Sequence, residues 1–556
     1  MTEGARGEAG TGGASAAGAS AAGASIGSAK IGSGRSGART GGAARARHDP
    51  IDPALRRLAT VVILGAIMSI LDTTIVNVAI DTLGRDFHSP LGTIQWVLTG
   101  YLLALATVIP LTGWAMERFG AKRMWILSLV LFLAGSVLSG AAWSASALIV
   151  FRIIQGLGGG MIMPIGQAIM ARAAGPERIG RVMSVLGVPM LLGPVLGPVI
   201  GGLVVDSFSW RWIFYVNVPI GIVAIIAAVR RLPRDEGTDR SVRLDGVSLA
   251  LLSPGLGAVV YGLSEAGQGS SASVFVPLVV GLGLVVAFVV HALHTRGSPL
   301  IDVRLFLDRS FAAAAGTTFL FGAALFGAML LLPLYYQVVR GDSALSAGLL
   351  MAPQGIGAAL VMPMAGRLTD RLGAGRIVPV GLVVAILGTV AYTQVGAGTS
   401  YAWLAVSLLV RGIGFGFVMM PAMAAAYQTL TVGQVARATT AINIVQRVGG
   451  SVGTAVLAVV LEHQISLAFH TSGSLGGVAT IPPHLLHEVA PRLAVAFAHT
   501  FWWAVVMTVV ALVPALVLPR HPVAGRSGAG GAVGAGAGDD GDGGEGGRVP
   551  ALPVPD

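Results

Sequence analysis

Hydrophobic residues occur in long runs along this chain, separated by short polar stretches. Runs of about 20 apolar residues are long enough to cross a bilayer as helices. We expect fourteen such helices, near 58–80, 95–116, 124–143, 147–171, 182–205, 211–229, 246–265, 274–294, 311–336, 345–366, 377–396, 402–428, 438–461 and 498–518. The pattern predicts an all-α polytopic membrane protein.

The composition agrees with this pattern. Hydrophobic residues make up 54% of the 556 positions and charged residues 11%, and the mean hydropathy is +0.78, which excludes an ordinary soluble domain. There is no Cys, and the ten His follow no metal-binding spacing, so we predict no metal site and no cofactor. The net charge of +10 is spread over short loops and tails, which favours membrane topology over nucleic-acid binding.

The basic residues also predict the orientation of the chain. Most Lys and Arg between spans fall in alternate loops, and the remaining, outer loops carry only Arg85, Arg211, Arg340 and Arg492. By the positive-inside rule, both termini are cytoplasmic and the protein is a multi-pass protein of the cell membrane. The Gly-rich segments 1–57 and 519–556 are predicted to be disordered cytoplasmic tails.

One carboxylate lies well inside a predicted span. The first apolar run begins after Arg57, so Asp72 lies roughly 20 Å into a hydrocarbon layer about 30 Å thick. A charge at that depth carries a penalty of at least about 2.5 kcal/mol, which marks Asp72 as a functional residue. We expect water to reach it from a central cavity.

Asp72 is predicted to carry protons. Desolvation favours its protonated form, so the group can take up and release protons near neutral pH. An inward proton crossing 100 mV delivers about 2.3 kcal/mol, which supports roughly a fifty-fold outward gradient of a neutral substrate. The alternative is a permanently protonated Asp72 that hydrogen-bonds between helices, with Thr73 or Asn77 as local partners.

The sequence contains an internal repeat. The stretch Gly113–Arg123 after the second span and the stretch Gly366–Arg376 after the tenth share a glycine, an acid followed by Arg, and a second glycine at the same spacing. A second pair matches Arg152 and its glycines in the fourth span with Arg411 and its glycines in the twelfth. We therefore predict two six-helix bundles, 58–230 and 310–518, with two extra helices in the linker 231–309 and a long outer loop at 462–497.

Five motifs in order resemble the major facilitator superfamily, and in particular its fourteen-span drug:proton antiporter family. They are the two repeated turns, Leu71–Ala79, Trp210–Pro219 and the fifth span from Gly193 to Gly202. Glu117 stands where that superfamily usually has Asp. The resemblance implies the major facilitator fold, two six-helix bundles plus two inserted helices, and proton-coupled efflux of drugs or antibiotics.

The motifs name the candidate functional residues. We expect proton coupling at Asp72 and, by resemblance, at Arg152, which is followed by a glycine-rich face. The gating loops contain Gly113, Glu117, Arg118, Gly120, Asp370, Arg371 and Gly373. The antiporter motif comprises Gly193, Pro194, Gly197, Pro198, Gly201 and Gly202. Polar residues expected in the substrate cavity are Tyr101, Gln155, Gln354, Asn443 and Gln446.

Each motif also has a purely structural interpretation. Gly193, Gly197 and Gly201 share one helix face, so they permit close helix packing whether or not they seal a cavity. The cytoplasmic turns can be solvated loops that obey the positive-inside rule, although a repeated acid favours gating. Arg447, inside the thirteenth span, is expected to snorkel to the cytoplasmic interface.

These observations predict an exporter. The expected partners are a small amphipathic substrate, protons and the lipid bilayer, with the protein acting as a monomer. An importer or uniporter of the same fold is the alternative, and the fifth-span motif argues against it. A non-transporting sensor would need a folded soluble domain, and an enzyme would need a nucleophile, metal cluster or phosphate loop, none of which the sequence contains.

Overall fold

The computed structural model describes residues 52–175, 178–235, 238–239, 241–266, 271–295, 299–428, 430–431, 433–469 and 483–520. Every regular element in these ranges is a helix. The predicted N-terminal tail up to Ile51 and the C-terminal tail from residue 521 lie outside the described residues.

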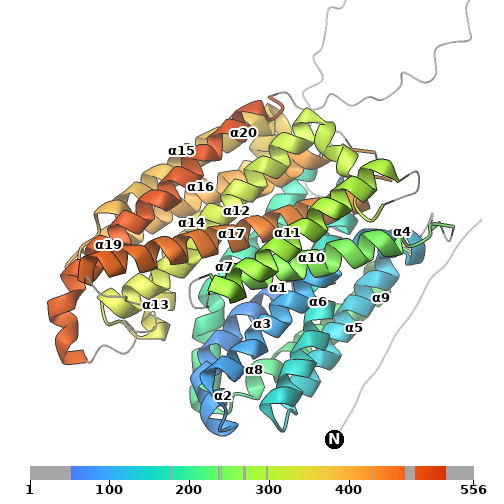
Figure 1. Cartoon of the computed structure of the whole chain (residues 1–556). Helices are drawn as coiled ribbons and strands as arrows, with labels where there is room; N and C mark the ends of the chain where they lie inside the picture. Colours follow the sequence, from blue (N-terminus) through green and yellow to red (C-terminus); the bar gives the residue numbers. More distant parts are fainter. Residues whose placement is uncertain are drawn as a thin grey trace, which may run out of the picture. The chain divides into compact units, whose positions relative to one another are not determined.

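The first half of the chain forms a group of helices that pack on one another (Figure 1). Its α5 packs on α6, α3 on α6, and α9 on both α1 and α5. The elements are α1 (Pro53–Ile75), η1 (Val76–Ala79), α2 (Ile80–Asp86), α3 (Leu91–Val108), α4 (Leu111–Phe119), α5 (Ala121–Gly140), α6 (Ala145–Ala174), α7 (Ile179–Ser207), α8 (Trp212–Tyr215) and α9 (Asn217–Arg231).

The second half repeats this arrangement. Here α12 packs on α17, and α16 packs on both α14 and α15. The elements are η2 (Val303–Leu307), α12 (Arg309–Leu334), η3 (Tyr335–Val339), α13 (Ala344–Leu350), α14 (Ala352–Leu372), α15 (Ala374–Val390), η4 (Ala391–Gln394), α16 (Tyr401–Tyr427), α17 (Val435–Phe469), α19 (Pro483–Val510) and α20 (Leu512–Val517).

Two further helices connect the halves, α10 (Gly246–Ser264) and α11 (Ser271–His294). They pack on each other, and α10 also contacts α3 of the first half and α17 of the second. Figure 1 shows this pair, in green, between the blue and the orange helices. The inserted helices therefore touch both halves through α10.

Asp245 caps the N-terminus of α10 and links it to α11. Its Oδ1 accepts hydrogen bonds from the backbone N–H groups of Val247 and Ser248, and its Oδ2 lies 2.9 Å from Nε2 of His291 in α11. Burial raises the pKa of Asp245, but hydrogen bonds from Ser248 and His291 outweigh it, so the pKa lies below its usual value. Asp245 is thus both the N-cap of α10 and its link to α11.

Asp245→Ala should destabilise the folded protein modestly. A lost N-cap costs about 1 kcal/mol, so we expect the unfolding midpoint to fall by roughly 1–3 °C. Asp245→Asn keeps an acceptor for the cap, so its unfolding midpoint should fall less. Because the pKa is lowered on folding, the carboxylate stabilises the protein above its ordinary pKa, and this contribution disappears as the pH falls through the lowered value. Equal midpoints for wild type and Asp245→Ala would contradict this role.

The structure supports a multi-pass membrane protein. Among the described residues, twelve helices are long and apolar enough to cross a bilayer, or up to thirteen if the bent pair formed by α3 and α4 is one span. That pair corresponds to the predicted second span and bends by 55°. The bend lies at Pro110, which has no N–H to continue the backbone hydrogen bonds of α3.

Two predicted boundaries are wrong. The first helix begins at Pro53 rather than near residue 58, because Asp52 caps it and Pro53 occupies its first turn. The predicted outer loop 462–497 is helical in its described parts, since α17 continues to Phe469 and α19 begins at Pro483. Residues 470–482 of that loop lie outside the described residues.

Candidate functional site

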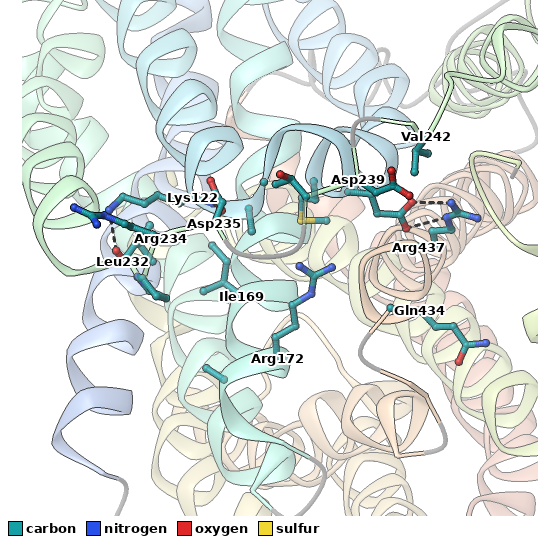
Figure 2. A pocket seen from close by; sticks show the side chains of 18 of the residues that line it. Lys122, Ile169, Arg172, Leu232, Arg234, Asp235, Asp239, Val242, Gln434 and Arg437 are labelled. Atoms are coloured by element: carbon teal, nitrogen blue, oxygen red, sulfur yellow. Dashed lines mark hydrogen bonds and ion pairs between the residues drawn. The ribbon is translucent and has the colours of Figure 1, made fainter.

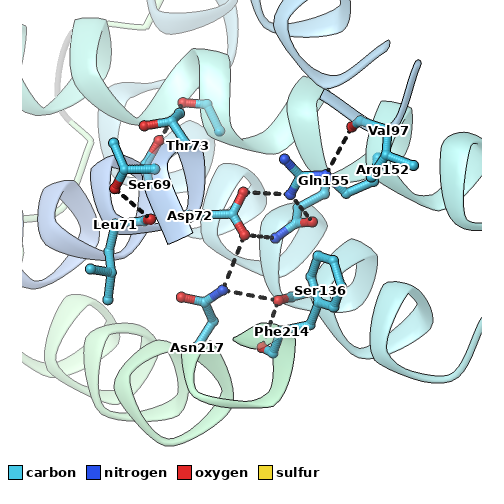
Figure 3. A network of polar contacts seen from close by, with 12 residues as sticks. Ser69, Leu71, Asp72, Thr73, Val97, Ser136, Arg152, Gln155, Phe214 and Asn217 are labelled. Carbon is cyan, nitrogen blue, oxygen red and sulfur yellow. Dashed lines mark hydrogen bonds and ion pairs between the residues drawn. The ribbon is translucent and has the colours of Figure 1, made fainter. Parts of the chain in front are cut away.

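Asp72 lies at the centre of a buried polar network (Figure 3). Its side chain has no exposed surface. Oδ2 accepts a hydrogen bond of 2.6 Å from Nη1 of Arg152 in α6, which is also an ion pair. Oδ1 accepts from Nε2 of Gln155 at 2.8 Å and from Nδ2 of Asn217 at 3.3 Å. Donors from α6 and α9 therefore satisfy both oxygens of this buried carboxylate.

Arg152 is held by several contacts besides Asp72. Its Nη1 also donates to Oε1 of Gln155 at 2.8 Å, and its Nε donates to the carbonyl of Val97 at 3.3 Å. The guanidinium lies over the ring of Tyr101, 4.0 Å from the centroid, an arrangement that favours a cation. Nη2 of Arg152 and the hydroxyl of Tyr101 are buried and have no hydrogen-bond partner in the described part of the chain.

The expectation that Asp72 is wetted by a central cavity is wrong for this conformation. A cavity of about 380 Å³ is lined by Ser69, Ile70, Thr73 and Thr74 of α1, but not by Asp72. These four residues form one face of α1. At 3.6 residues per turn, the direction of Asp72 differs from the centre of that face by about 130° around the helix axis. Both alternative local partners are also wrong, because Thr73 donates to the carbonyl of Ile70 within its own helix and Asn77 is exposed.

The central cavity lies between the two halves and α10. Its lining residues come from α1, α3 and α6, from α12, α16 and α17, and from α10, which contributes Val260, Leu263 and Ser264. Asn443 and Gln446 line it as predicted, whereas Tyr101, Gln155 and Gln354 do not. Gln155 binds Asp72, and Gln354 accepts a hydrogen bond of 2.7 Å from Nη1 of Arg411.

Arg447 also lines this cavity, so the expectation that it snorkels to an interface is wrong. It follows Val435, the first residue of α17, by about 18 Å of helix, which is too far for its side chain to reach the helix end. The helix face that carries Asn443, Gln446 and Arg447 points into the cavity, a direction that the apolar periodicity of the sequence did not indicate.

The structure changes the pairing within the repeat. A Cβ on Gly156 would meet the carbonyl of Tyr101, and a Cβ on Gly412 would meet that of Gln354, so these two glycines are equivalent. A Cβ added at Gly135 would meet the backbone of Gln155, and a Cβ added at Gly388 would meet the backbone of Arg411. Arg411 therefore corresponds to Gln155 rather than to Arg152, and the sequence pairing of the two arginines is wrong by about one helical turn.

The antiporter motif of α7 packs directly on α1. Side chains added at Gly193, Gly197 and Gly201 would meet Ile70, Thr74 and Ile75 of α1, and the Thr74 hydroxyl donates to the carbonyl of Gly193 at 3.2 Å. The shared glycine face is thus a close helix contact beside Asp72. Gly202 has no atom within 4 Å of an added Cβ. The side chains of Pro194 and Pro198 lie outside the described part of the chain.

Gly197→Ala should loosen this contact. The new methyl group would overlap the Thr74 side chain, and such overpacking typically costs about 1–3 kcal/mol. We expect a lower unfolding midpoint and slower exchange of substrate in vesicles. Gly202→Ala is the matched control, because its methyl group has space and Ala favours the helix. If the two variants behave alike, close packing at Gly197 does not matter.

The two repeated turns join the halves. Glu117 at the end of α4 accepts hydrogen bonds of 2.9 and 2.7 Å from Nε and Nη2 of Arg437 in α17. Asp370 near the end of α14 accepts from the backbone N–H groups of Gly180 and Arg181 in α7, at 2.9 and 3.2 Å. Each acid therefore binds near the N-terminus of a helix from the other half, where a negative charge is favoured.

The glycines of the turns make these contacts sterically feasible. Gly113 packs against α17, where an added Cβ would lie 3.1 Å from the Thr440 hydroxyl. Gly120 and Gly373 have φ angles of 96° and 82°, which disfavour other residues. Arg118 donates to the carbonyl of Val242 at 3.0 Å, and Arg371 is exposed. The turn residues thus have distinct roles that the motif alone did not separate.

A second cavity, of about 780 Å³, lies beside the first turn (Figure 2). Its wall includes the segment after α9, in which Asp235 accepts hydrogen bonds from the backbone N–H groups of Lys122 and Arg123 at 2.7 and 3.1 Å. The ammonium of Lys122 in turn donates to the carbonyl of Leu232. This segment therefore fixes the start of α5 next to the contact between Glu117 and Arg437.

Fold and site together define a membrane transporter built from two repeated helical halves. The sequence model for the Major Facilitator Superfamily matches residues 62–454, and the chain belongs to that family. It is 41% identical over 508 residues to the multidrug resistance protein B homolog of Mycobacterium tuberculosis (strain ATCC 25618 / H37Rv), a match that covers 87% of this chain and 93% of the relative.

Other matches agree with this assignment. The multidrug export protein EmrB of Escherichia coli (strain K12) is 30% identical over 413 residues, covering 73% of this chain and 80% of EmrB. The human transporter MFSD10 shares the fold with a TM-score of 0.54 and 17% identity over 82% of this chain and 100% of that chain. The xylose symporter XylE does so with a TM-score of 0.51 and 14% identity, over 82% and 94%. The protein is thus a transporter and not an enzyme.

Proposed function

We propose that this protein exports amphipathic small molecules across the cytoplasmic membrane in exchange for protons, by alternating access to the central cavity. The observation that carries this proposal is the buried ion pair between Asp72 and Arg152. Asp72 lies on α1, the helix that also carries the cavity-lining Ser69 and Thr73 and that packs on the antiporter motif. The names of the relatives support drugs or antibiotics as substrates.

Protonation of Asp72 is the proposed coupling step. A proton on the carboxylate removes the charge that attracts Arg152, so the ion pair weakens and α1 and α6 can separate. The buried groups without partners on Arg152 and Tyr101 favour such a rearrangement, because a second arrangement can satisfy them. Loss of the proton restores the pair. The position of α1 thereby depends on the protonation state of Asp72.

Gating is proposed to occur at the two repeated turns. In the described conformation Glu117 binds Arg437 and Asp370 binds the start of α7, so both contacts close the halves against each other on the side assigned to the cytoplasm. Access from the cytoplasm would require both contacts to open. Charge-assisted hydrogen bonds of this kind contribute about 1.5–3 kcal/mol each, which is small enough to be broken in a transport cycle.

We also propose a topology of fourteen spans with both termini in the cytoplasm and a monomeric protein. In this proposal α7 and the bent pair of α3 and α4 each cross the membrane, in addition to the twelve straightforward spans. The two bundles are joined by the inserted helices α10 and α11. The excess of Lys and Arg in alternate loops supports the orientation.

A growth-inhibition panel tests the proposed export. The protein would be produced in a bacterial host that lacks its own drug exporters, and the minimum inhibitory concentrations of chemically varied antibiotics and dyes would be compared with those of a host that carries an empty vector. We expect increased resistance to a subset of amphipathic compounds and lower accumulation of the same compounds in energised cells. Unchanged accumulation across the panel would reject export.

A further inference from the structure

The central cavity has a charge of only one sign. Of the described residues that line it, Arg447 alone is charged, and none is acidic. Asp72 points away from the cavity and is neutralised by Arg152. The remaining polar groups are amides and hydroxyls, including those of Asn443, Gln446 and Thr454. A molecule in this cavity therefore encounters a positive charge without a compensating carboxylate.

Arg447 has no partner of its own in the described part of the chain. It forms no ion pair and no hydrogen bond with the described residues, and it is only partly buried. An arginine this far inside a membrane-spanning helix is expensive unless an anion or water solvates it. Arg152 differs, because Asp72, Gln155 and Val97 surround it. Among the described residues that line the central cavity, Arg447 is thus the one cation.

The surroundings of Arg447 fit one end of an amphipathic molecule. Ser451 and Thr454 follow it on the same face of α17 and line the cavity. The Thr454 hydroxyl donates to the carbonyl of Gly450 at 3.0 Å, so its oxygen remains an acceptor, whereas the Ser451 hydroxyl can donate to a bound molecule. The other walls are apolar, with Met163, Met329, Met419, Leu105 and Phe326 among the lining residues. Methionine side chains adapt to apolar bodies of different shapes.

We propose that Arg447 binds the anionic group of the substrate, so that this cavity selects amphipathic anions such as carboxylates on an aromatic or aliphatic body. The inference rests on the proposed function, because it assumes that the central cavity carries the exported molecule. Guanidinium donates two parallel hydrogen bonds to a carboxylate, which gives both affinity and orientation. Lipophilic cations are disfavoured, since none of the described residues that line the cavity is acidic.

The test compares two fluorescent probes that differ in charge. Full-length protein in lipid nanodiscs at pH 7.5 is titrated with 1-pyrenebutyrate or with the neutral 1-pyrenebutanol, and saturable tryptophan-to-pyrene energy transfer is measured against empty nanodiscs. We expect wild type to bind pyrenebutyrate about tenfold more tightly than pyrenebutanol, the ratio that a charge-assisted hydrogen bond provides. Equal affinities in wild type would overturn the proposal without reference to any variant.

Variants then assign the preference to Arg447. Arg447→Gln should weaken pyrenebutyrate binding about tenfold and leave pyrenebutanol within twofold. Arg447→Lys keeps the charge but not the paired hydrogen bonds, so it should retain only part of the preference. Arg123→Gln, which makes the same change at an exposed arginine that does not line the cavity, is the control and should keep the preference as well. A preference that survives in a monodisperse Arg447→Gln protein would overturn the proposal.

The outcomes also separate this inference from the proposed function. Charge-selective binding that depends on Arg447, together with no proton-driven efflux in vesicles, would reject the export mechanism and support the anion site. Proton-driven efflux of neutral and anionic probes at equal rates, unaffected by Arg447→Gln, would reject the anion site and support the export mechanism.

Discussion

Asp72→Asn is expected to abolish uphill efflux. Asparagine has nearly the shape of aspartate and can still accept hydrogen bonds from Gln155 and Asn217, but it cannot take up a proton. Without that step, the proton gradient delivers none of its roughly 2.3 kcal/mol per 100 mV to the substrate. The measurement is substrate accumulation in everted membrane vesicles energised with a pH gradient, with downhill exchange recorded in parallel.

The control for Asp72→Asn is a double variant that also removes the charge of Arg152. Removing one partner of a buried ion pair leaves the other charge uncompensated, at a cost of about 3–5 kcal/mol, so Asp72→Asn should also be less stable. The double variant Asp72→Asn with Arg152→Gln removes both charges and should recover much of that stability while remaining unable to drive uphill efflux. Undiminished uphill efflux by either folded variant would refute the role of Asp72.

Charge reversal at the first turn is the second large effect. Glu117→Arg places two cations together in the closed contact, and Arg437→Glu places two anions there, so each should shift the halves apart and reduce transport about tenfold or more. The swapped double variant restores an opposite pair and should recover most of the activity. The loss and the recovery are measured as transport rates in vesicles that contain equal amounts of each variant.

Arg123→Glu is the matched control for the reversal. It changes the net charge by two units, in the same direction as Arg437→Glu, but the Arg123 side chain is exposed and its backbone N–H donates to Asp235. We expect near wild-type transport from it. Losses of equal size in Arg123→Glu and Glu117→Arg would contradict the gating role. So would a swapped variant no better than the single variants, and the charges would then serve membrane topology rather than the contact between the halves.

The sequence predicted an all-helical membrane protein because membrane spans depend on local apolar length. The described residues contain twelve to thirteen of the fourteen expected spans. Asp72 and Arg152 were identified singly, since a charge inside an apolar run is visible without a structure. Their pairing was not predicted, because it depends on the rotation of α1 and α6 about their axes. The roles of Gln155 and Asn217 were missed for the same reason. For Asn217, the available signal was a polar residue in a motif close to the start of an apolar run.

Other differences arise from side-chain direction and register. Arg447 was expected to snorkel although the predicted span began about 14 Å before it, because the rotation of α17, which directs this side chain into the cavity, is not visible in the sequence. Arg411 was matched to Arg152 because both precede glycines, but the packing of Gly412 on α14 fixes a register one turn away. The contribution of α10 to the central cavity had no sequence signal, since its contacts with both halves are tertiary.

The most direct test of proton exchange is the sign of the proton movement that substrate causes. Wild-type protein would be reconstituted in liposomes with equal pH on both sides and a pH-sensitive dye inside, and an uncharged substrate from the resistance panel would be added outside. The account predicts that the lumen becomes alkaline as substrate enters and protons leave, and that Asp72→Asn liposomes show no change. Acidification of the lumen, which indicates symport, or substrate entry without any proton movement would contradict it.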